Sequence, residues 1–257
     1  MEFGSDQAVE RVVRAMYENF GEQLTMDDMA RTALFSKFHF SRVFRQVTGI
    51  SPGRFLSAVR LQEAKRLLLS TSLTVAEISN RVGYTSVGTF STRFKNSVGV
   101  PPTLYRQSGG YRPLIPVDPR RDGRGSRPVT IEGRVSLPNG DDTGPVFLGL
   151  FPEAIPQGAP TRCSVLEEPG RYELANVPQG TWHLLVYSAS PHHDVVIPYP
   201  TLTAPAPWVG SRGPITVGTD TDVVSVDVEL RPMRVIDPPL LMALFDPQTA
   251  RVDATGS

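Results

Sequence analysis

The sequence predicts a chain of two parts, an all-α domain followed by an antiparallel Greek-key β-sandwich. Apolar residues recur with the period of a helix in the first part, and from Val129 onwards they alternate with polar residues as in a strand. The charge divides at the same place. Residues 1–112 carry 15 Lys and Arg against 9 Asp and Glu, a net charge of +6, and residues 113–257 carry 11 against 17, a net charge of −6. This asymmetry favours a basic part that faces a polyanion and an acidic part that does not.

One pattern is written twice in the helical part, at Thr25–Pro52 and again at Thr74–Pro102. Matching residues lie 49 positions apart in the first half of the pattern and 50 apart in the second half, which a single insertion at Thr85 explains. Each copy predicts a short helix, a tight turn and a second helix with one basic face; in the first copy Thr25 is the expected N-cap of a helix over Met26–Ala33. This is the outline of a helix-turn-helix, which lays its second helix in the DNA major groove.

The second helix of the first copy is predicted from Ser36 to about Val47. Its apolar residues Phe40, Val43, Phe44 and Val47 are spaced to face a core, so Phe38, Arg42 and Arg45 face outward with Ser41 at the side. We expect Phe38, Ser41 and Arg42 to read bases, Phe38 by contact with thymine methyls and Arg42 at guanine. Lys37 and Arg45 are better placed for phosphates. A solvated basic face with one exposed Phe is the alternative.

The second copy has the same core and a different outward face. Phe90 and Phe94 point inward, which leaves Gly88, Thr92 and Lys95 outward with Ser91 at the side. We therefore expect the first copy to supply most base discrimination, and the second to anchor on phosphates through Arg93, Lys95 and the helix start near Ser86. Base reading by apolar contact from Val87, Thr89 and Thr92 stays open.

Two further helices frame these units. Ala8–Phe20 is predicted to be a helix buried along one stripe. Gly53–Leu69 is predicted as a connector of about 25 Å, with Arg54, Arg60, Lys65 and Arg66 on its outer side. Recognition helices held about 34 Å apart enter successive major grooves, so one monomer could read two grooves of double-stranded DNA.

Residues 8–106 resemble the DNA-binding domain of the AraC/XylS family of bacterial transcription regulators, including the closing GVPPTLYR of Gly99–Arg106. The resemblance implies seven helices, a role at promoters and contact with RNA polymerase. It also implies base reading from both second helices. Those base-reading positions here are Phe38, Ser41, Arg42, Val87, Gly88, Ser91 and Thr92. One departure is Leu34, which stands where the family often has Gly in the first turn.

The predicted domains are residues 6–108 for DNA binding, a Gly- and Pro-rich linker at 109–128, a β-sandwich at 129–232 and a tail at 233–257. About seven short strands are expected in the sandwich. IEGRVSLPNG and GRYELANVPQGTWHLLVYS resemble carboxypeptidase regulatory-like or transthyretin-like domains. Such a domain could sense an effector, or serve only as a dimerisation or protein-contact scaffold. The apolar DPPLLMALF of the tail could cover a sandwich edge or dock on a partner chain; the sequence does not choose between them.

Several function classes are disfavoured. No apolar run reaches the roughly 20 residues of a membrane span, so a cytoplasmic protein is expected. The lone Cys163 excludes an internal disulfide and a multi-cysteine zinc site, and it is expected to be a structural thiol. His192, His193 and Asp194 form the one dense cluster of potential metal ligands, but neighbouring residues point in different directions and a polar loop is favoured. Neither enzyme activity nor a cofactor is predicted.

Overall fold

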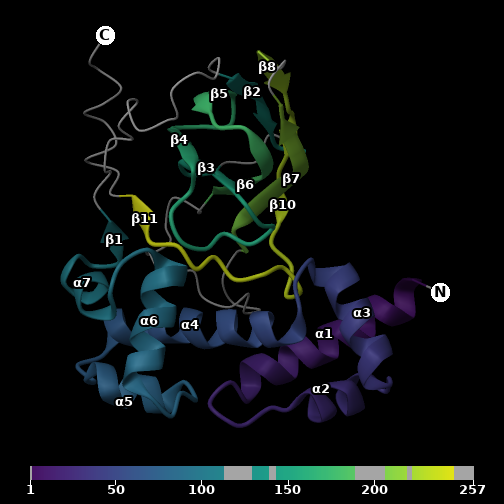
Figure 1. Ribbon diagram of the computed structural model, residues 1–257, viewed down its shortest axis with the longest axis vertical. Helices are drawn as coiled ribbons and strands as arrows, with labels where there is room; N and C mark the ends of the chain where they lie inside the picture. The colour runs from purple at the N-terminus through teal and green to yellow at the C-terminus, as the bar shows by residue number, and fades with distance from the viewer. Residues whose placement is uncertain (1, 113–128, 139–142, 189–205, 219–221, 246–257) are drawn as a thin grey trace. The chain divides into compact units, whose positions relative to one another are not determined.

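The computed structural model describes residues 2–112, 129–138, 143–188, 206–218 and 222–245 (Figure 1). They form two compact units. The helical unit comprises residues 1–112 together with 234–244, and the β-rich unit comprises 113–233 with 245–257. The cluster of His192, His193 and Asp194 and the Arg residues of the linker lie outside the described residues. Within the described part of the chain, no helix combines the length and apolarity needed to cross a membrane.

Seven helices make up the described helical unit, as predicted. They are α1 Glu2–Glu18, α2 Met26–Ala33, α3 Lys37–Thr48, α4 Pro52–Ser70, α5 Val75–Arg81, α6 Val87–Val98 and α7 Pro102–Gln107. The first helix begins before the predicted Ala8 and ends before Phe20, whereas the predicted bounds of α2 are those observed. Two short strands, β1 Tyr111–Arg112 and β11 Leu244–Phe245, pair with each other.

The same capping motif starts α2 and α5. The side chain of Thr25 accepts a hydrogen bond from the backbone N–H of Asp28, and the Asp28 carboxylate accepts one from the N–H of Thr25 at 2.9 Å. Thr74 and Glu77 repeat this pair at the start of α5, with a 2.7 Å bond from the Thr74 N–H. Each box satisfies N–H groups that a helix start otherwise leaves unpaired, so both copies begin at a sequence-defined residue.

Aromatic side chains anchor each second helix in the core of the unit. Phe40 and Phe44 of α3 are fully buried, and the ring of Phe44 meets that of Phe55 in α4 at 5.6 Å. Fifty residues later Phe94 of α6 meets Tyr105 of α7, again at 5.6 Å. Edge-on ring pairs of this kind fix orientation as well as burying area. The repeat therefore extends through the helix that follows each helix-turn-helix.

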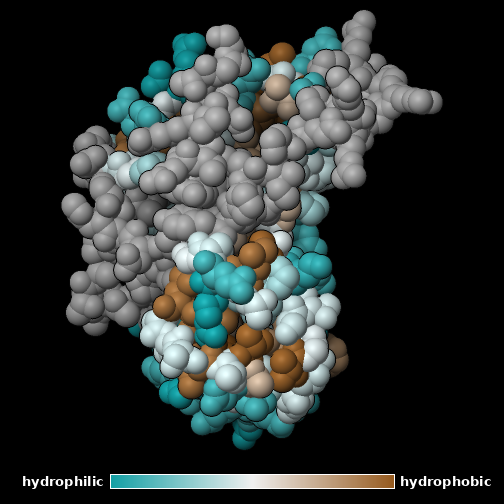
Figure 2. All heavy atoms as spheres, turned by 90° about the vertical axis from the view of Figure 1, so that its left-hand side faces the viewer, coloured by the Kyte–Doolittle hydropathy of each residue, from teal (hydrophilic) through white to brown (hydrophobic). Residues whose placement is uncertain are grey.

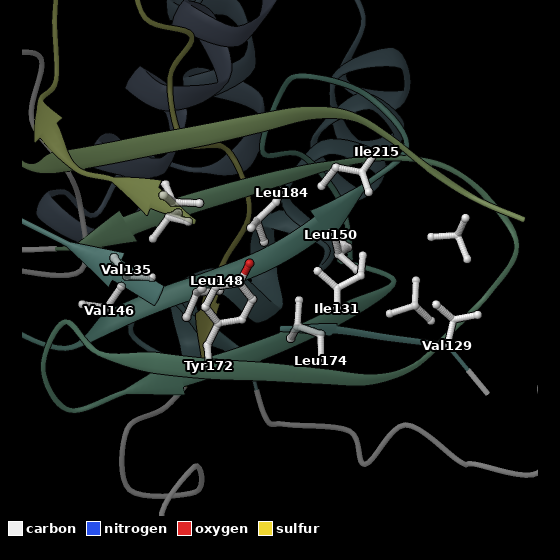
Figure 3. Packing of buried hydrophobic residues seen from close by; sticks show 14 of the residues in the cluster. Val129, Ile131, Val135, Val146, Leu148, Leu150, Tyr172, Leu174, Leu184 and Ile215 are labelled. Atoms are coloured by element: carbon white, nitrogen blue, oxygen red, sulfur yellow. The ribbon is translucent and has the colours of Figure 1, made fainter. Parts of the chain in front are cut away.

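The β-rich unit contains two larger sheets. Its described strands are β2 Val129–Ser136, β3 Val146–Phe151, β4 Arg162–Leu166, β5 Arg171–Val177, β6 Gly180–Ser188, β7 Trp208–Val217, β8 Val223–Ser225, β9 Val228–Glu229 and β10 Arg231–Pro232. One sheet has the order β10-β7-β6-β3-β4, and the other has β5-β2-β8 with β9 also paired to β2. Side chains from both sheets share one buried core, which includes Ile131, Leu148, Leu174 and Leu184 (Figure 3).

The pairing within the smaller sheet differs from the antiparallel prediction. Strand β2 pairs antiparallel with β5 but parallel with both β8 and β9. Gly133 permits this, because a β-carbon there would lie 2.1 Å from the Val226 carbonyl oxygen, which sits between β8 and β9. The Tyr172 hydroxyl donates to the same carbonyl at 2.6 Å, and Asp227 accepts from the Arg134 N–H at 2.8 Å. The absence of a side chain at Gly133 thus allows the segment that contains β8 and β9 to pack closely against β2.

Candidate nucleic-acid interface

The turn between α2 and α3 is closed by a residue in a left-handed conformation. Leu34 has φ 60° and ψ 37°, its N–H donates to the Arg31 carbonyl, and the N–H of Phe35 donates to the Ala30 carbonyl. The second copy makes the same pair of bonds 49 residues later, where Gly83 has φ 83°. The departure from Gly at Leu34 has therefore not altered these two bonds. The copies differ after them, because Thr85 adds one residue before Ser86, the N-cap of α6, whereas Ser36 caps α3 two residues after Leu34.

The outward face of α3 is the one that the core spacing predicts. Phe38 is 92% exposed, Arg42 and Arg45 are exposed, and Ser41 is half-buried. Lys37 is exposed as well, but its Nζ lies 2.7 Å from the Asp27 carboxylate. That ion pair would have to open or be shared when Lys37 meets a phosphate. The contacts of these side chains with DNA stay predictions.

Two exposed residues beside this face were not among the predicted contacts. Leu34 is 83% exposed, and His39 is exposed with its ring packed edge-on against Phe35 at 4.6 Å. In the sequence, the feature that could have indicated an exposed His39 is its position directly after Phe38. Apolar side chains also reach the surface elsewhere on the helical unit, in small groups between polar ones (Figure 2). Exposure alone therefore does not distinguish the predicted contact residues. On α3 they are exposed or half-buried residues that share one helix face with Arg42 and Arg45.

The α6 face is smaller and less charged at its centre. Val87, Gly88 and Thr92 are exposed and Ser91 is half-buried. A β-carbon at Gly88 would meet only the Ser86 hydroxyl, at 3.8 Å, so the fold itself does not require Gly there. Because Gly88 has no side chain, the backbone near the start of α6 is accessible. Ser86 is the N-cap and accepts from the Thr89 N–H at 3.3 Å, and the cations Arg93 and Lys95 are exposed further along.

The connector α4 lies between the two helix-turn-helix copies in the sequence. Its 19 residues span about 28 Å. The prediction that Arg60 and Lys65 lie on its outer side is wrong. Arg60 reaches the loop after α1, where it donates to the Phe20 carbonyl at 2.8 Å and to the Glu22 carbonyl at 2.7 Å. Lys65 is 1% exposed, because the segment 234–244 covers it with the carbonyls that its ammonium group binds. Neither cation belongs to a DNA-facing set.

A helix-turn-helix domain family model matches residues 29–108 of the chain. The HTH-type transcriptional activator AarP of Providencia stuartii is 35% identical over 103 residues, which is 40% of this chain and 76% of AarP. This chain belongs to the AraC family. Its helical unit is an AraC-type DNA-binding domain.

Two other similar proteins match part of this chain. A transcriptional regulator of Haemophilus influenzae is 42% identical over 83 residues, covering 32% of this chain and 28% of the regulator. The C-terminal domain of AraT, a response regulator from Geobacillus stearothermophilus, is 35% identical, with 43% of this chain and 89% of that domain covered and a TM-score of 0.38. In this chain the AraC-type domain is joined to a β-rich unit.

Proposed function

We propose that this AraC-family protein is a sequence-specific transcription regulator whose single chain reads two successive major grooves. The observation that carries the proposal is the repeated helix-turn-helix, with an exposed face on α3 and on α6 and one connector helix of about 28 Å between the two copies. AarP, of whose length the match covers 76%, is described as a transcriptional activator.

Base discrimination is assigned mainly to α3. Arg42 is long enough to contact guanine O6 and N7 together, and Phe38 supplies an apolar ring for thymine methyls beside it. Ser41 lies at the side of this face and is half-buried. The partly apolar face of α6, formed by Val87, Gly88, Ser91 and Thr92, reads fewer base edges because its side chains are short.

Phosphate contacts are assigned to the basic and N-terminal groups around these faces. Lys37 and Arg45 flank the reading face of α3, while Arg93 and Lys95 flank that of α6. The start of α6 near Ser86 adds unpaired backbone N–H groups and the positive end of the helix dipole. Such contacts position the protein on DNA without selecting a sequence.

The β-rich unit is proposed to bring regulation to the DNA-binding domain. Its two sheets with one shared core fit a sandwich of the carboxypeptidase regulatory-like or transthyretin-like kind, used for effector sensing or for contact with a protein. The alternative is a scaffold for dimerisation or protein contact without a small-molecule effector. RNA polymerase is the proposed partner at promoters.

The test compares Arg42→Ala with Arg45→Ala in the full chain. DNA bound by the wild-type chain is first selected from a random library, and affinities for the selected duplex and for single-base variants are then measured by gel shift. We expect Arg42→Ala to lose about 1–3 kcal/mol of discrimination at one guanine. Arg45→Ala should weaken binding to every duplex by a similar factor. If Arg42→Ala kept both affinity and base preference, the assignment of α3 as the principal reader would be wrong.

A further inference from the structure

The chain returns to the DNA-binding domain after the β-rich unit. Residues 234–244 belong to the helical unit, and Figure 1 shows this segment running along α4 to β11. It begins with a turn in which the Asp237 carboxylate accepts from the Arg234 N–H at 2.6 Å. Four consecutive residues then become almost fully buried: Leu240, Leu241, Met242 and Ala243. We call residues 234–244 the strap.

The strap binds the connector helix through Lys65. The ammonium nitrogen of Lys65 donates to the Leu240 carbonyl at 2.9 Å and to the Met242 carbonyl at 3.4 Å. The ring of Tyr105, from α7, lies 5.8 Å from the same nitrogen. A lysine is rarely buried unless its donors are satisfied, because removing the ammonium group from water is costly. The two strap carbonyls supply that compensation in the C-terminal half of α4.

The strap also binds the end of the second recognition helix. The Ala243 N–H donates to the carbonyl of Val98, the last residue of α6, at 2.9 Å. Carbonyls in the last turn of a helix have no partner within the helix, so the strap satisfies one that would otherwise need water. Beyond it, β11 pairs with β1, which follows α7. A single extended segment thus contacts α4, α6 and the strand after α7.

The first recognition helix is closed differently. At the position equivalent to Val98, fifty residues earlier, stands Thr48, whose hydroxyl donates to the Phe44 carbonyl at 2.8 Å and to the Ile50 carbonyl at 3.0 Å. The end of α3 is therefore tied by its own side chain. Val98 has no hydroxyl, and the bond at the end of α6 comes from a residue 145 positions later.

We propose that the strap fixes α6 on α4, so that simultaneous reading of two grooves depends on residues 234–244. The proposal rests on the proposed function, because spacing between recognition helices matters only if both bind one duplex. Met233, which belongs to the β-rich unit, directly precedes the strap. Residues 113–233 of the β-rich unit are consequently inserted in the sequence between two segments of the DNA-binding domain.

The main experiment compares two truncations of the full chain. One stops after Met233 and lacks the strap; the matched control stops after Phe245 and retains it. Amide hydrogen exchange without DNA is expected to show lost protection in α4 and in the last turns of α6 for the first truncation only. Protection in α2 and α3 should stay as in the full chain. Unchanged protection in α6 would overturn the proposal.

Binding is then measured on two duplexes, the one selected by the full chain and one in which the half contacted by α6 is scrambled. Without the strap, affinity for the selected duplex is expected to fall about tenfold, since a loosely held second module lowers the effective concentration of its contacts. Affinity for the half-scrambled duplex should change little. An equal loss on both duplexes would point to general destabilisation and contradict the positioning role.

A point variant keeps the test decisive if the truncation does not fold. Lys65→Ala in the full chain removes the bonds to the strap, and Arg66→Ala is its control, since Arg66 is exposed and paired with Glu63 on the same helix. Only Lys65→Ala should release protection at the end of α6. If the full chain selects no DNA at all, the proposed function fails, whereas hydrogen exchange still decides whether the strap holds α6.

Discussion

Leu34 holds a backbone conformation that its side chain disfavours. Left-handed geometry costs a residue with a β-carbon about 1–2 kcal/mol, and the equivalent turn uses Gly83 at φ 83°. Because the Leu34 side chain is 83% exposed, removing it sacrifices little burial. The residue therefore contributes strain to the first turn and an apolar group to the surface beside the α3 face.

Leu34→Gly is expected to stabilise the helical unit. The strain relieved exceeds the added backbone entropy of Gly, which is about 0.5–1 kcal/mol, so the net gain is on the order of 0.5 kcal/mol. Urea unfolding followed by helical circular dichroism measures it. Leu34→Ala is the control, because it shortens the side chain but keeps the β-carbon. Equal shifts for Gly and Ala would mean that the left-handed backbone is not the cause.

Lys65 gives the helical unit a pH dependence in the alkaline range. Burial lowers the pKa of Lys65 to about 7, whereas a lysine in an unfolded chain titrates near 10.4. Between these values the unfolded state binds more protons than the folded state, so stability rises with pH. Asp28 and Glu77, whose pKa values are lowered by bonds to Thr25 and Thr74, titrate in acid and leave this range alone.

From pH 7 to about pH 9 the free energy of unfolding should rise by roughly 2 kcal/mol in the wild-type chain. Lys65→Met should lose most of that rise, because it has no ammonium group to discharge. Urea midpoints of both proteins at a series of pH values provide the measurement. Parallel curves for the two would show that Lys65 keeps an ordinary pKa in the folded protein.

At the scale of elements, local chemistry determined what could be predicted. Thr25 and Thr74 start helices through bonds that reach only three residues along the chain, and the spacing of Phe40 and Phe44 orients α3. The outward face of the candidate site follows from that orientation. What was not predicted depends on distant partners. The pairing of β2 with β8 joins Thr130 to Val223, and the burial of Lys65 depends on Leu240. Periodicity carries no information about such pairings.

At the scale of the whole molecule, a net charge of zero conceals two oppositely charged halves. The +6 of residues 1–112 and the −6 of residues 113–257 cancel in the sum, yet a polyanion responds to the local field of the surface that it approaches. Four exposed cations flank the proposed reading faces: Lys37, Arg45, Arg93 and Lys95. The chain should therefore bind DNA with the salt dependence of a basic protein despite its neutral total.

With four phosphates neutralised, the slope of log K against log salt should be about −3.6 on duplex DNA. The double variant Arg93→Ala, Lys95→Ala should reduce its magnitude by about 1.8 while leaving base preference intact, since phosphate contacts position without specifying. Arg14→Ala is the control, because Arg14 lies on α1 and pairs with Glu10 at 2.6 Å. Fluorescence anisotropy between about 50 and 200 mM salt gives the slopes. A slope near zero for the wild-type chain would contradict the basic interface, and an unchanged slope in the double variant would remove α6 from it.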